Sequence, residues 1–210
     1  MPAADSLLTF AVASVVLLMI PGPAVLYVVN RSVSDGRSVA LASVGGLELG
    51  NLVHALAATA GLSAVIATSA TAFSIVKWAG ALYLIGVGAL TLLRRPDAIS
   101  TEGGHLSYRR AFTQGVIVNV LNPKVALFFL SYLPQFVDPG RGPAWTQVLV
   151  LGLTFVVLGI CTDSLWAIAT STLRSVLLRG RSLPFVRRWV SGSVFVLLGV
   201  MAARAHRHAA

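Results

Sequence analysis

Six long apolar stretches divide this sequence, and they restrict the folds open to it. They cover residues 7–29, 39–64, 71–93, 111–133, 145–171 and 184–203. A helix needs about 20 predominantly apolar residues to cross a hydrocarbon core about 30 Å thick. The sequence therefore predicts an all-α membrane protein with six transmembrane helices, organised as a single domain over residues 1–210.

The composition favours the same class. Hydrophobic residues make up 56% of the chain and charged residues only 11%, whereas a soluble domain carries about 25% charged residues. No basic segment precedes the first stretch, and that stretch is too long for a signal-peptide core, so we expect it to be retained as a spanning helix. A lone cysteine, Cys161, excludes an internal disulfide,.

The net charge of +9 is distributed between the apolar stretches, which favours contact with the lipid surface over binding of nucleic acid,. Eleven arginines lie in or next to the first, third and fifth connections, and three lie on the other side. The third connection, residues 94–110, is the one sizeable polar loop. Basic residues favour the cytoplasmic side, so we predict a multi-pass protein of the bacterial cytoplasmic (inner) membrane with both termini outside.

An internal repeat is visible between the two halves, residues 1–95 and 111–204. The run that begins Gly22-Pro23 in the first stretch is similar to the run that begins Asn122-Pro123 in the fourth. The second and fifth stretches each carry one acid, Glu48 and Asp163. Because three helices is an odd number, the second copy must be inserted upside down. The sequence thus predicts two inverted three-helix repeats, an arrangement found in many transporters.

Prolines interrupt the first stretch of each repeat. Pro21 and Pro23 in one and Pro123 in the other lack a backbone N–H, so carbonyls such as those of Leu17 and Asn119 lose their usual partners,. An isolated proline often makes only a kink. Paired interruptions, however, indicate a substrate site, where a restarted half-helix can offer N–H groups to a carboxylate and freed carbonyls can accept from an ammonium group.

The acids of the two repeats are candidates for proton coupling. At 1.5 Å per residue, Glu48, Asp163 and Lys124 lie roughly 14, 12 and 18 Å from the cytoplasmic side, so they could share one layer. Desolvation favours the protonated form of a buried acid, and a carboxylate can also pair with a substrate ammonium group. In the alternative interpretation the three residues form a structural network, with Lys124 neutralising one acid while the other stays protonated.

The amide side chains of Asn51, Asn119 and Asn122 could line the predicted substrate site. In the alternative interpretation they only form hydrogen bonds to backbone groups freed by the helix breaks. The full set of candidate substrate-binding residues is Pro21, Gly22, Pro23, Glu48, Asn51, Asn119, Asn122, Pro123, Lys124 and Asp163.

Several of these motifs together resemble one family over nearly the whole chain. They are Pro21-Gly22-Pro23, the glycine-rich run from Gly45 to Gly50, Gly80-Ala81-Leu82-Tyr83-Leu84, Asn119-Val-Leu-Asn-Pro-Lys-Val-Ala-Leu-Phe-Phe129 and Leu133-Pro-Gln-Phe136. The chain resembles the LysE/RhtB family of bacterial amino-acid exporters (LysE-type translocators). Many members have an acid or an amide directly after the first motif, where this chain has Ala24.

The resemblance implies a secondary transporter that exports an amino acid or an amino-acid-like metabolite by proton antiport, with no cofactor. Its expected partners are that substrate, protons and the lipid bilayer, and the sequence leaves a homo-oligomer open. An alternative is an exporter of a metal such as cadmium within the same superfamily, although no His/Cys cluster favours a soft metal. An enzyme is not expected, since no nucleophile–base set or metal motif is visible.

Overall fold

The computed structural model describes residues 1–62, 78, 82, 89 and 106–173. Every regular element in the two long described ranges is a helix. Apart from three single residues, the predicted spans at 71–93 and 184–203 lie outside the described residues. The all-helical class is therefore confirmed for the part of the chain that the structure covers.

The first predicted span is broken at the proline pair. Helix α1 (Ala4–Met19) ends before Pro21, and α2 (Pro23–Ser34) starts at the second proline with a bend of 52° between them. Proline suits the first position of a helix, where its missing N–H would have no intrahelical partner anyway. The predicted interruption is confirmed.

The fourth predicted span has the corresponding break. Helix α6 (Tyr108–Val120) is followed by α7 (Pro123–Leu127) after a bend of 43°. The chain then continues through a π-helix, η2 (Phe128–Tyr132), and a 3₁₀ turn, η3 (Leu133–Phe136). The start of α6 falls inside the range expected for the third loop, because the side chain of Ser107 caps the helix by accepting from the Arg110 N–H.

Two further helices are straight and long. One is α3 (Arg37–Ala57), extended by the π-helix η1 (Ala58–Leu62). The other is α8 (Ala144–Thr172), which follows the short turn η4 (Pro139–Arg141). Each is long and apolar enough to cross a membrane, and each bent pair passes the same test as one unit. The described residues thus hold up to four of the six predicted spans.

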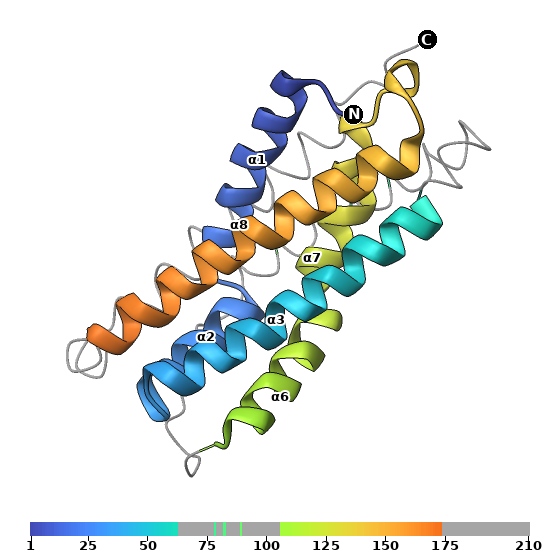
Figure 1. Cartoon of the computed structure of the whole chain (residues 1–210). Coiled ribbons are helices and arrows are strands. Elements are labelled where there is room, and N and C mark those ends of the chain that lie inside the picture. Colours follow the sequence, from blue (N-terminus) through green and yellow to red (C-terminus); the bar gives the residue numbers. More distant parts are fainter. Residues whose placement is uncertain (63–77, 79–81, 83–88, 90–105, 174–210) are drawn as a thin grey trace.

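Small residues let α3 and α6 approach closely. A methyl group on Gly50 would lie 2.8 Å from the Asn119 Cβ, and one on Gly115 would lie 2.5 Å from the Ser43 carbonyl oxygen. Figure 1 shows α3 between α6 and the long α8. Because membrane helices associate largely through close packing, these glycines bring Glu48 on α3 next to the break in the fourth span.

The two bent spans run in opposite directions. At one end of the bundle the Met1 amino group donates to the Arg141 carbonyl at 3.0 Å. At the other end, where α2 finishes and α6 begins, the Leu106 N–H donates to the Asp35 carboxylate at 2.9 Å. Figure 1 shows the same arrangement, with the N-terminus beside the start of α8.

Candidate functional site

The two helix breaks meet through one side chain, that of Lys124. Its Nζ donates to the carbonyls of Leu17 and Ile20, each at 3.1 Å, at the broken end of α1. Lys124 lies in the first turn of α7 and is only 4% exposed. Gly22 lies against the Lys124 side chain, and a methyl group there would make an ordinary contact with Nζ at 3.4 Å. A positive charge at a helix C-terminus also complements the helix dipole.

The carbonyl freed by Pro123 has a side-chain partner as well. His54 Nε2, on α3, lies 3.0 Å from the Asn119 carbonyl oxygen, which also accepts from the Asn122 N–H at 3.0 Å. The imidazole ring stacks on Phe129 with 6.2 Å between ring centroids. Both breaks are thus completed by side chains from elsewhere in the chain, as buried backbone groups require.

A chain of amide side chains connects the second break to the acid on α3. The Lys124 backbone N–H donates to Asn122 Oδ1 at 3.1 Å, and Asn122 Nδ2 donates to Asn119 Oδ1 at 3.2 Å. Asn119 Nδ2 donates to Asn51 Oδ1 at 2.7 Å, and Asn51 Nδ2 donates to Glu48 Oε2 at 2.9 Å. A backbone N–H can only donate, so the first link fixes the orientation of every amide. All four donors point toward Glu48.

Glu48 and Asp163 form a buried carboxyl pair at the end of this chain. They are 5% and 3% exposed, and their side chains lie within hydrogen-bonding contact of each other. Glu48 Oε1 accepts no hydrogen bond from any other group among the described residues, and Oε2 accepts from Asn51. Two carboxyl groups can bond to each other only when one of them carries a proton. The ammonium group of Lys124 is an electrostatic neighbour of Asp163.

Most of the predicted site residues therefore lie together. Glu48, Asn51, Asn119, Asn122, Lys124 and Asp163 form one buried polar network. Pro21 and Gly22 are buried beside it, whereas Pro23 and Pro123 are exposed at the starts of α2 and α7. Pro23 and Pro123 thus mark the helix starts from exposed positions.

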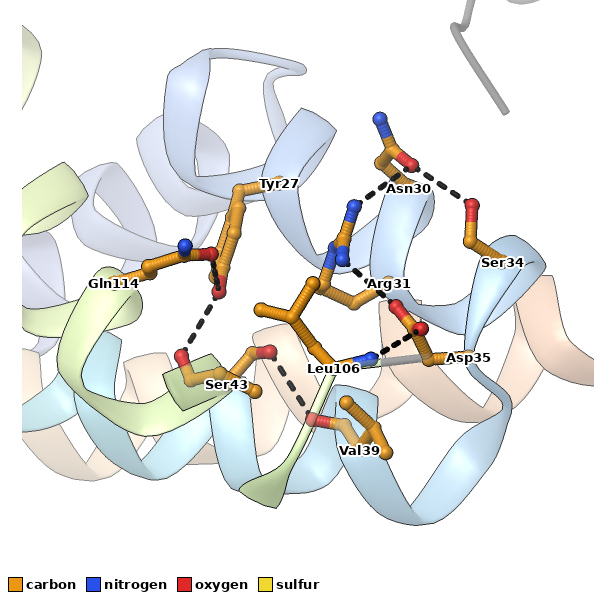
Figure 2. Close-up of polar contacts among 10 residues, drawn as sticks. Tyr27, Asn30, Arg31, Ser34, Asp35, Val39, Ser43, Leu106 and Gln114 are labelled. Carbon is orange, nitrogen blue, oxygen red and sulfur yellow. Dashed lines mark hydrogen bonds and ion pairs between the residues drawn. The ribbon is translucent and has the colours of Figure 1, made fainter. Parts of the chain in front are cut away.

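A second polar cluster, not predicted from the sequence, lies between α2 and the start of α6. Figure 2 shows the Tyr27 hydroxyl close to Gln114, and it donates to the Ala111 carbonyl at 2.9 Å. Arg31 pairs with the fully buried Asp35 carboxylate at 2.8 Å. The i, i+4 spacing of that pair is a signal that the sequence offers. The tyrosine contact, which spans 84 residues of chain, has no local signal.

Comparisons with known proteins identify one family and several relatives. The model of the family described as "LysE type translocator" matches residues 15–206. An uncharacterized membrane protein of Vibrio cholerae is 31% identical over 200 residues, which is 94% of this chain and 96% of that protein. Homoserine/homoserine lactone efflux proteins of Salmonella typhimurium and Salmonella typhi are each 31% identical over 202 residues, covering 95% of this chain and 96% of theirs. No solved structure matches.

Proposed function

The chain belongs to the LysE type translocator family, and from this we propose that it exports an amino acid or an amino-acid-like metabolite across the bacterial cytoplasmic membrane in exchange for protons. The names of the homoserine/homoserine lactone efflux relatives support a substrate of this class. The observation that carries the proposal is the buried pair of Glu48 and Asp163 beside two broken helices.

The carboxyl pair supplies a chemical reason for exchange. Without substrate, a proton shared between Glu48 and Asp163 removes the repulsion between two buried negative charges. A substrate ammonium group can donate hydrogen bonds to the same carboxylate oxygens, but only after the shared proton has left. Proton and substrate thus compete for one site, and this competition is what antiport requires. Lys124 balances one negative charge throughout the cycle.

Alternating access would come from the two repeats, residues 1–95 and 111–204, moving against each other around this layer. The opposite directions of the two bent spans support an inverted arrangement. Inverted-repeat transporters place their sites at broken helices near the middle of the membrane. In this account both termini lie outside, and the cluster of Tyr27, Arg31 and Asp35 faces the cytoplasm.

Uptake into inside-out vesicles tests the proposal. Export corresponds to uptake in this geometry, so an acid-inside gradient should accelerate the entry of one or more labelled amino acids, and homoserine is the first probe to use. A protonophore should abolish the acceleration, and vesicles without the protein give the background. The proposal fails if no compound in a broad amino-acid panel enters above background, or if cadmium enters while the amino acids do not.

A further inference from the structure

One residue outside the polar network touches its central acid. Gly159 lies on α8 directly against the Glu48 carboxyl group. A Cβ atom built at position 159 would lie 2.5 and 2.7 Å from the two carboxyl oxygens, closer than real Cβ contacts allow. The Glu48 carboxyl group therefore occupies space that every residue type except glycine would fill.

The location of this glycine points to a role beyond helix packing. Glycine is less stable than alanine in the interior of a helix, yet Gly159 is buried near the middle of the 29-residue α8. It precedes Asp163 by four residues, so both lie on one face of the helix. Glu48 Oε2 accepts from Asn51, whereas Oε1 accepts no hydrogen bond among the described residues, so the contact with α8 helps to fix where the carboxyl group lies.

We propose that Gly159 is a positioning residue for the carboxyl pair. Its missing side chain lets the Glu48 carboxyl group lie flat against α8, where Oε2 accepts from Asn51 and the group interacts with Asp163. A methyl group at 159 pushes the carboxyl group away, so it cannot keep both contacts. The effect on stability follows from the geometry alone, whereas the effect on transport rests on the proposed function.

A double-mutant cycle tests the placement without any substrate. We expect Gly159→Ala to lower the melting temperature of the detergent-purified protein when position 48 is Glu. The decrease in melting temperature caused by Gly159→Ala should remain in a Glu48→Gln background, because glutamine has the same size as glutamate. It should shrink in a Glu48→Asp background, because aspartate is one methylene shorter. Direct contact makes such effects non-additive.

Gly152→Ala is the matched control. Gly152 also lies on α8 and also faces α3, where a methyl group would come within 2.7 Å of the Ala55 Cβ. It is seven residues from Gly159 and is not a neighbour of Glu48. Its effect on melting temperature should be the same in all three backgrounds. An equal loss for Gly159→Ala in all three backgrounds would overturn the proposal.

Transport adds a readout that packing alone would not change. We expect Gly159→Ala to raise the KM for the exported amine by about tenfold, because the Glu48 carboxylate loses a hydrogen bond. Adding Glu48→Asp should bring the KM part of the way back. If Gly159→Ala does not insert into the membrane, adding Glu48→Asp should restore insertion. Failure to insert in both the Glu48 and the Glu48→Asp backgrounds would contradict the placement of Gly159 against the Glu48 carboxyl group. If the wild-type protein moves no amino acid, the proposed function fails while the melting cycle still decides the role of Gly159.

Discussion

At the scale of single residues, Lys124 replaces hydrogen bonds that the broken first span cannot make. Its amine reaches the Leu17 and Ile20 carbonyls from the other half of the chain. The sequence predicts that freed carbonyls can accept from a substrate ammonium group. In the structure Lys124 supplies that ammonium itself. In the proposed function, the carboxyl pair then binds the amine of a substrate.

Removing this amine should therefore destabilise the protein. Lys124→Met leaves the Ile20 carbonyl without its described partner, and a buried unsatisfied group of this kind costs about 1–3 kcal/mol. Lys124→Gln keeps a donor on a shorter side chain and should lose less. Thermal unfolding in detergent compares the two variants. Equal stability of Lys124→Met and the wild-type protein would show that the hydrogen bonds from Lys124 to the end of α1 contribute nothing to the free energy of unfolding.

Much of the buried network could be predicted from residue types alone. An acid deep within an apolar stretch is expected to lie inside the bundle, and by the depth estimate Glu48, Asp163 and Lys124 could share one layer. The contact of Gly159 with the Glu48 carboxyl group could not be predicted, because it depends on which face of α8 meets α3. Tyr27 could not be predicted either, since its partner Ala111 lies far away in the sequence.

At the scale of elements, the breaks in α1–α2 and α6–α7 were the most predictable feature of the fold. Prolines mark them directly, and proline within a helix has few other outcomes. What compensates each break was not predictable, because it depends on tertiary contacts. Helix α3 contributes in two ways, with His54 at the Asn119 carbonyl and Asn51 in the amide chain.

His54 should therefore stabilise the broken fourth span. His54→Phe keeps a ring against Phe129 but removes the polar contact with the Asn119 carbonyl. We expect it to lower the free energy of unfolding by about 1 kcal/mol, the usual net value of one hydrogen bond. His54→Gln retains a donor and serves as the control. If His54→Phe is as stable as His54→Gln, the contact does not support the break.

At the scale of the whole molecule, the described arginines divide between the two ends of the bundle. Arg31, Arg37, Arg109 and Arg110 lie on the elements that meet where α2 ends and α6 begins, while Arg141 lies beside the N-terminus at the opposite end. This separation matches the uneven distribution of arginines in the sequence, which predicts that the arginine-rich end is cytoplasmic. The orientation itself stays a prediction.

Labelling of single cysteines tests this orientation. In a Cys161→Ser background, Ala4→Cys places a thiol at the N-terminal end of α1, and Ser38→Cys places one at the start of α3; both positions are exposed. A membrane-impermeant thiol reagent added to intact cells should label Ala4→Cys only, and lysed cells should show labelling of both. Labelling of Ser38→Cys alone in intact cells would reverse the topology.

The central claim is that one buried carboxyl pair holds either a proton or the substrate amine. Simultaneous recording of internal pH and labelled homoserine in proteoliposomes tests it most directly. The wild-type protein should move protons opposite to homoserine, and Glu48→Gln and Asp163→Asn, which keep the side-chain size, should each abolish the coupled proton movement while inserting normally. Homoserine flux with unchanged proton counterflow in both variants would contradict the account.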